Sequence, residues 1–177
     1  MYRVSALISV LLACASAQAV TLQQLSMEEM AQNATSIVRA RVTGSSAGLS
    51  GSTIYTHYRL QVSETWKGAA LNEVMVPGGS VGLTRQSFPG VPDLTTGNEY
   101  ILFLWTSSTG ITHLLGLQQG VFNVTGTNDA SSIAVRARIG ELMLDSAGHR
   151  VPDQPLQLKV SDLRSRVSRA AITGRAR

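Results

Sequence analysis

Residues 54–62 read IYTHYRLQV, an unbroken alternation that predicts a long β-strand. The more apolar face of this strand carries Ile54, Thr56, Tyr58, Leu60 and Val62. The opposite face carries Tyr55, His57, Arg59, Gln61 and Ser63. Such a strand covers a core on one side and meets solvent on the other. Its length favours a small barrel, because a strand that serves both halves of a closed sheet must be long and bent.

Strand patterns also lie before and after this stretch. Residues Ile37–Val42 alternate in the same way, and the polar, glycine-rich residues Gly44–Ser52 predict a loop between the two strands. Val74–Val76 has the pattern of a short strand. Tyr100–Trp105 is nearly all apolar, which predicts a central strand buried on both faces.

The second half of the chain predicts further short strands. Ile111–Leu117 and Gly120–Val124 are interpreted as a hairpin around Gln118 and Gln119. Weaker strand patterns and one tight turn follow at Ile133–Ile139, Leu142–Leu144, Asp145–Gly148 and Leu156–Val160. Many short strands, few helices and glycine-rich connections predict a mainly β domain, either a small barrel or a sandwich.

Two helices are predicted, one near each end of this domain. Residues Ser26–Glu29 have the pattern of a capping box, in which a hydroxyl and a carboxylate bind each other's backbone amides. A short helix from Met27 to about Asn33 is expected to follow. Later in the chain, Ser161 is predicted to cap a final helix that carries Leu163, Val167 and Ala171 along one face.

The first nineteen residues predict an export signal. Arg3 gives a positive start, Val4–Ala15 is apolar, and Ala17-Gln18-Ala19 has the small-x-small pattern of a cleavage site. Cleavage there would leave a mature chain that starts at Val20 and is secreted or periplasmic. The apolar run is shorter than the ~20 residues of a membrane-spanning helix, so no transmembrane span is expected after processing.

Cys14 is the only cysteine in the chain, and it lies inside the predicted signal. Its removal would leave no disulfide, no thiol nucleophile and no thiolate metal ligand in the mature protein. In an alternative interpretation, Leu11-Leu12-Ala13-Cys14 loosely resembles a bacterial lipobox, and a lipid on Cys14 would anchor the mature chain to a membrane. Both interpretations stay open.

Length and charge divide the 177-residue chain into a signal at 1–19, one barrel-like domain at 20–160 and a basic helix or tail at 161–177. From Val20 to Leu163 there are nine Lys or Arg against eleven Asp or Glu, a net charge of −2. The tail carries Arg164, Arg166, Arg169, Arg175 and Arg177. Such a cluster is either a solvated helix end or a contact for an anionic surface. No aromatic side chains are interleaved with the arginines, so nucleic acid is not expected as a partner.

One block of residues resembles a known family. It comprises Ala34–Val42, the pair Ile54-Tyr55, Tyr58–Val62, the turn Trp66-Lys67-Gly68 and the later strand Glu99–Leu102. This order resembles the amino-terminal domain of the tissue inhibitors of metalloproteinases and the related netrin-type modules, over residues of about 34–124. The resemblance implies a mainly β fold, a small closed or partly open OB-like barrel, that acts as a binding module. Modulation of a secreted protease is one role that it implies.

The departures from that family limit what can be transferred. In the inhibitors, an amino-terminal cysteine chelates the zinc of the target protease through its amine and its carbonyl oxygen. Here the predicted mature chain starts with Val20 and Thr21 and has no cysteine, so no inhibitory residue is carried over. The chain is also similar to uncharacterised exported bacterial proteins, and that similarity implies no activity.

Catalytic and metal-binding patterns are not found in the sequence. His57, His113 and His149 are far apart, and none has a second ligand at metal-binding spacing. There is no Gly-x-Ser-x-Gly elbow and no phosphate-binding loop. The chain is therefore predicted to be non-enzymatic, with no metal and no cofactor. A hydrolase that uses a serine, His113 and Asp93 remains the third interpretation.

The long excursion Pro77–Gly97 is the predicted functional surface. It presents Arg85, Phe88 and Asp93 among small residues, a mixture found in recognition loops that a rigid scaffold holds. An equal alternative is that Phe88, with Pro89 and Val91, only plugs the mouth of the barrel.

Two function classes follow from these patterns. The first is an exported, non-enzymatic binding domain for a secreted protein such as a protease. The second is an envelope-associated structural protein or lipoprotein, held by Cys14 or by the arginine tail. The two differ in the surface that binds, since the first uses the loop and the second uses the ends of the chain.

Overall fold

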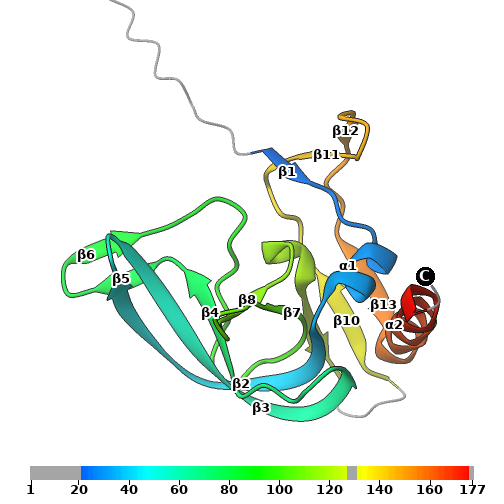
Figure 1. The fold of residues 1–177 in the computed structure, drawn as a ribbon, viewed down its shortest axis with the longest axis horizontal. Coiled ribbons are helices and arrows are strands. Elements are labelled where there is room, and N and C mark those ends of the chain that lie inside the picture. Colours follow the sequence, from blue (N-terminus) through cyan, green and yellow to red (C-terminus); the bar gives the residue numbers. More distant parts are fainter. Residues whose placement is uncertain (1–20, 127–130, 176–177) are drawn as a thin grey trace, which may run out of the picture.

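The computed structural model describes residues 21–126 and 131–175. The predicted signal and its cleavage site, with Cys14 and Val20, lie outside these residues, and so does Arg177. Within the described residues the chain is mainly β, with 13 strands and two α-helices (Figure 1). Neither of these helices has the length and the apolar character that crossing a membrane requires.

An eight-stranded sheet forms the body of the structure. Its spatial order is β13 (Leu156–Lys159), β10 (Ile133–Arg136), β9 (Val121–Thr125), β7 (Glu99–Thr106), β2 (Ser36–Ser50), β3 (Thr53–Lys67), β4 (Glu73–Pro77) and β8 (Thr112–Leu114). The pairings are antiparallel except the one between β4 and β8, which is parallel. β8 also pairs with β7, so β7 contacts β2, β8 and β9.

The hairpin of β2 and β3 is longer than the sequence predicts. The predicted loop Gly44–Ser52 is mostly strand, since backbone pairs continue from Gly44 opposite Arg59 to Ser50 opposite Thr53. The loop prediction was wrong because backbone hydrogen bonds need no apolar side chain, and most side chains of this arm are exposed. Gly51 turns the chain with a φ of 61°, in the left-handed region that glycine tolerates.

Two apolar cores lie on opposite faces of β2 and β7. The strand-side core consists of Val38, Ala40, Val42, Tyr58, Leu60, Val74, Val76, Leu94, Tyr100, Leu102, Leu104, Leu114 and Val121. The helix-side core consists of Met27, Met30, Ala31, Ala34, Ile37, Ile101, Phe103, Phe122, Val124, Ala134, Val160, Leu163, Val167 and Ala170. β7 therefore contributes Leu102 to one core and Phe103 to the other. Its predicted burial on both faces is confirmed for Tyr100–Leu104, whereas Trp105 is 44% exposed.

Both predicted helices are present, and they pack against each other (Figure 1). α1 (Met27–Asn33) begins with the predicted capping box: the Ser26 hydroxyl accepts from the Glu29 amide, and the Glu29 carboxylate accepts from the Ser26 amide. These bonds from Ser26 lower the pKa of Glu29. α2 (Val160–Arg175) begins one residue before the predicted cap Ser161. Its buried face is Leu163, Val167 and Ala170, with the predicted Ala171 half-buried beside them.

The predicted hairpin of Ile111–Leu117 and Gly120–Val124 is wrong. Instead, β8 and β9 pair with successive stretches of the same strand, since Leu114 lies opposite Leu104 and Val121 lies opposite Leu102. A 3-10 helix at Leu117–Gly120 separates them. Within it the Gln119 side chain is buried, accepts a hydrogen bond from the Leu25 amide and donates one to the Gln23 carbonyl. The segment that was predicted to be a hairpin turn is therefore a 3-10 helix, which Gln119 links to the segment before α1.

Two small sheets complete the described structure. β1 (Thr21–Gln23), β11 (Leu142–Leu144) and β12 (Arg150–Val151) form the first, and β11 and β12 flank the predicted turn at Asp145–Gly148. β5 (Gly79–Val81) and β6 (Thr84–Gln86) form the second, inside the predicted excursion Pro77–Gly97. The β5–β6 hairpin lies at the opposite end of the molecule from α2 (Figure 1).

Candidate functional site

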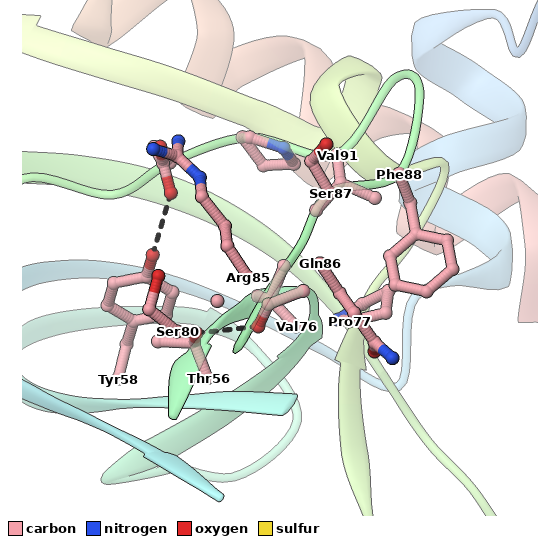
Figure 2. Close-up of a pocket in the computed structure, with 14 residues that line it drawn as sticks. Thr56, Tyr58, Val76, Pro77, Ser80, Arg85, Gln86, Ser87, Phe88 and Val91 are labelled. Carbon is pink, nitrogen blue, oxygen red and sulfur yellow. Dashed lines mark hydrogen bonds between the residues drawn. The ribbon is translucent and has the colours of Figure 1, made fainter. Parts of the chain in front are cut away.

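The three candidate residues of the excursion line one cleft. Arg85, Phe88 and Asp93 contribute to a cavity of about 310 Å³ between the β5–β6 hairpin and the loop that follows it (Figure 2). The floor includes Tyr58 and Val76, which also belong to the strand-side core. The excursion therefore folds back over one end of that core.

The β5–β6 hairpin is fixed to β3 by side-chain hydrogen bonds. The Gln86 amide accepts from the Ile54 amide at 2.6 Å and donates to the Ser52 carbonyl at 2.8 Å. The Thr56 hydroxyl donates to the Gly78 carbonyl at 2.8 Å. At Gly79, with a φ of 129°, a Cβ atom would clash with the Thr56 hydroxyl. These contacts set the position from which Arg85 enters the cleft.

A buried hydroxyl supports the acidic side of the cleft. Tyr58 is 5% exposed, and its hydroxyl donates to the Asp93 carboxylate and accepts from the Leu94 amide, both at 3.4 Å. Burial raises the pKa of Tyr58, and the neighbouring Asp93 adds to the rise, while the Leu94 bond opposes it. The phenol therefore stays neutral and holds the Asp93 carboxylate at the edge of the cleft.

Arg85 and Phe88 supply a positive charge and an apolar surface. The exposed Arg85 guanidinium forms no hydrogen bond or ion pair with any described residue. Figure 2 shows Tyr58 and the tip of Arg85 toward one side of the cleft and the Phe88 ring toward the other. Phe88 is 41% exposed, whereas Val91 packs against the strand-side core. Of the three residues in the predicted plug, Val91 thus covers the core, whereas Phe88 and Pro89 are exposed to solvent.

The arginines of the predicted tail do not all face solvent. Arg164 turns back onto the sheet, forms an ion pair with Glu64, and places its guanidinium carbon 5.3 Å from the centre of the Trp66 ring. Arg166 and Arg169 are exposed on α2. Nothing is described for the side chain of Arg175 or for Arg177. The described arginines therefore split between a contact with the body and a solvent-facing pair.

A charged cluster that sequence reasoning missed lies beside Arg164. The Arg39 guanidinium, in β2, contacts the Glu64 carboxylate at 3.0 Å and the Glu99 carboxylate at 3.1 Å. Glu64 also accepts a hydrogen bond from the Trp66 indole at 2.9 Å. The only sequence signal was an arginine between apolar residues of a predicted core strand.

The turn Trp66-Lys67-Gly68, which carried part of the family resemblance, has a structural role. The Lys67 ammonium donates to the Ala31 and Gln32 carbonyls, each at 2.8 Å, at the carboxyl end of α1. Gly68 has a φ of 68°, and a Cβ atom there would clash with the Thr35 carbonyl oxygen. The turn joins α1 to β3 and lies outside the cleft.

The three histidines occupy separate places. The His57 Nδ1 atom lies 2.8 Å from the Glu73 carboxylate, His113 stacks on Trp105 with ring centres 6.4 Å apart, and His149 is exposed near Asp145. Across residues 21–126 and 131–175, no three His, Cys, Asp or Glu side chains gather as they would around a metal ion. His113 lines a different cavity from Asp93.

A scan against protein-family models found no match for this chain, and a search of the curated proteins found none either. The resemblance to the tissue inhibitors of metalloproteinases and the netrin-type modules therefore rests on the residue patterns of 34–124 alone. The chemistry of the cleft is independent of that resemblance, because Arg85, Phe88 and Asp93 lie in it through contacts made within this chain.

Proposed function

We propose that this chain is an exported, non-enzymatic binding domain whose cleft holds a segment of a secreted protein partner. One observation carries the proposal: Arg85, Phe88 and Asp93 line the same cleft, and the Arg85 charge has no partner among the described residues. Arginine and aromatic side chains dominate the energy of protein interfaces, where they act as buried anchors.

We also propose that five strands form a small OB-like barrel, which is the scaffold for this cleft. The proposal is supported by the pairings of β8, which contacts β4 on one side and β7 on the other, so that the order β7-β2-β3-β4-β8 returns to β7. Residues of all five strands meet in the strand-side core: Val38, Leu60, Val76, Leu102 and Leu114. OB barrels bind their partners along one face and its bordering loops.

The side chains of the cleft define the chemistry of the partner segment. Arg85 pairs best with a carboxylate, since a guanidinium and a carboxylate form parallel hydrogen bonds. Phe88 offers a ring for an apolar side chain, and Asp93 accepts hydrogen bonds from the partner's backbone or from a basic side chain. An extended segment with an acidic residue next to an apolar one fits these three groups. A secreted protease is the partner class that the family resemblance favours.

The alternative function is that of an envelope-associated protein, and one observation favours it. Arg166 and Arg169 are both exposed on the same helix and attract anionic surfaces. The two functions are separable because α2, which carries these arginines, and the β5–β6 hairpin, which borders the cleft, lie at opposite ends of the molecule (Figure 1).

The test is affinity capture from the extracytoplasmic fraction, with the mature chain from Val20 as bait. Arg85→Ala and Phe88→Ala are each expected to weaken capture of the partner by about 30-fold, the effect of losing ~2 kcal/mol at an interface anchor. Arg138→Ala, an exposed arginine outside the cleft, is the matched control and should change nothing. Capture that survives both cleft variants, but is lost with Arg166→Ala and Arg169→Ala together, would reject the cleft in favour of the envelope function.

A further inference from the structure

A further cavity lies at one end of the helix-side core. β10 and β13 place Arg136 opposite Leu156, and opposite residues of neighbouring strands point to the same face of a sheet. Leu156 packs against the helix-side core, so Arg136 lies on that face too. Both residues line a cavity of about 200 Å³, to which β11 contributes Met143 and the segment after β1 contributes Gln24. The cavity therefore lies where the small sheet of β1, β11 and β12 meets the large sheet.

The Arg136 guanidinium at this cavity has no hydrogen-bonded partner. It forms no hydrogen bond and no ion pair with any residue that the structure describes. Its Nε atom is buried, and its carbon lies 5.9 Å from the centre of the Phe122 ring. Burial lowers the pKa of Arg136, and the negative charge of Asp153 opposes this only in part. A half-buried cation without hydrogen bonds is costly, and a bound anionic group would remove that cost.

Asp153 is the other charged residue that lines the cavity. Its Oδ2 atom accepts hydrogen bonds from the amides of Ile139 and Gly140, each at 2.8 Å, and these bonds fix the carboxylate. Its Oδ1 atom bonds no residue of the described chain. The charge of Asp153 acts on Arg136, yet the two side chains form no ion pair with each other. A positive and a negative group thus border one cavity, and each can still form hydrogen bonds.

These two charges favour a ligand that carries both signs. A simple carboxylate would pair with Arg136 but meet repulsion from Asp153, and the reverse holds for a simple amine. A free amino acid satisfies both groups, since a guanidinium binds a carboxylate through parallel hydrogen bonds and a carboxylate accepts from an ammonium group. Met143 and Leu156 offer apolar surface to the side chain of the amino acid.

The size of the cavity limits the ligand to a small amino acid. A benzene molecule fits an apolar cavity of about 150 Å³, and sites for drug-sized molecules begin at about 300 Å³. The cavity at Arg136 lies between these two sizes. It therefore has room for about eight non-hydrogen atoms, the size of valine.

We propose that this cavity binds a small apolar free amino acid, with the α-carboxylate on Arg136, the α-ammonium group on Asp153, and the side chain against Met143 and Leu156. No residue that lines this cavity also lines the cleft of Arg85. The proposal therefore does not depend on the protein partner proposed for that cleft.

The test is a calorimetric titration of the mature chain from Val20 with L-valine. Two matched ligands each lack one charge: isovalerate lacks the ammonium group and isobutylamine lacks the carboxylate. Each should bind at least about tenfold more weakly than L-valine, the effect of losing one charged hydrogen-bonding group. In NMR spectra, L-valine should also shift the amide signals of Ile139 and Gly140, because these amides bond Asp153.

A charge-free variant tests the arginine directly. Arg136→Met removes the charge and keeps an unbranched side chain beside Phe122, so it should bind L-valine at least about tenfold more weakly. The change breaks no hydrogen bond within the described chain, so thermal unfolding without ligand should change little. L-valine should raise the unfolding temperature of the wild type and leave that of the variant unchanged. Arg138→Ala, an exposed arginine outside the cavity, is the matched control and should bind as the wild type does.

Three results would overturn the proposal. The first is isovalerate or isobutylamine binding as tightly as L-valine, a comparison made on the wild type and independent of how any variant folds. The second is Arg136→Met binding L-valine within about twofold of the wild type. The third is the absence of both heat and amide shifts up to about 10 mM L-valine.

Discussion

Replacing Glu64 by glutamine is expected to destabilise the protein by about 2 kcal/mol, because this carboxylate joins α2 to the sheet. Three donors converge on it: the guanidinium groups of Arg39 and Arg164 and the indole of Trp66. The Glu64 side chain is 26% exposed and that of Arg39 is 9% exposed, so solvent replaces little of what is lost. In the variant Arg39 still forms its ion pair with Glu99, which limits the loss of stability.

The magnitude follows from the number of bonds lost. A hydrogen bond to a charged group is worth about 1.5–3 kcal/mol when buried. In glutamine one oxygen becomes an NH2 group, so either the bond from Arg39 to Oε1 or the bonds from Arg164 and Trp66 to Oε2 are lost, and the bonds that remain lose the charge of the carboxylate. Partial exposure of Glu64 and of Arg164 reduces their combined value to roughly 2 kcal/mol.

Urea unfolding followed by circular dichroism measures this loss. Glu73→Gln is the matched control: its carboxylate is 52% exposed and pairs with His57, so it should cost less than about 0.5 kcal/mol. Amide exchange in α2 should also accelerate in the Glu64 variant and stay unchanged in the control. A Glu64 variant within about 0.5 kcal/mol of the wild type would refute the view that this cluster fastens α2.

Two further predictions concern local structure. Gly68→Ala should unfold at a clearly lower urea concentration than Gly51→Ala: both glycines have positive φ, but only at Gly68 would the new methyl group meet backbone, the Thr35 carbonyl. Equal midpoints would contradict the role assigned to that turn. The lowered pKa of Glu29 stabilises the fold at a pH above the range where a free glutamate titrates, and this contribution is lost as the pH falls through the lowered pKa. The stability difference between wild type and Glu29→Gln, measured by urea unfolding from pH 7 to pH 2, should therefore shrink in acid, and a constant difference would contradict it.

Local features were predictable from the sequence. The capping box of α1 needs only residues three positions apart, and so its pattern is complete within one turn of chain. The burial of Tyr100–Leu104 on both faces was visible as an apolar run. The strand at Gly44–Ser50 was not predictable, because its hydrogen bonds with β3 are made by the backbone. Such bonds require no apolar pattern in the side chains of these residues.

Pairings between distant segments were beyond the sequence patterns. The residue pattern of β8 and β9 is typical of two strands that form a hairpin. In the structure both strands pair with β7 instead of with each other, and this partner cannot be identified from their own sequence. Similarly, the residue types in the excursion made Arg85, Phe88 and Asp93 candidate binding residues. The cleft is also lined by Tyr58 from β3, which the sequence did not associate with them. The cluster of Arg39, Glu64 and Glu99 could not be predicted, since its members are separated by 25 and 60 residues.

The sharing of β2 and β7 by two cores has a consequence for the newly made chain. Until residues 160–170 have been synthesised, α1 is the only one of the two helices that can cover the helix-side face of both strands, and the core around Ile37 and Phe103 lacks the side chains of α2. The first half of the protein therefore gains little stability by folding early on its own. The helix-side core is thus completed only by the last part of the described chain, whereas the strand-side core needs no residue beyond Val121.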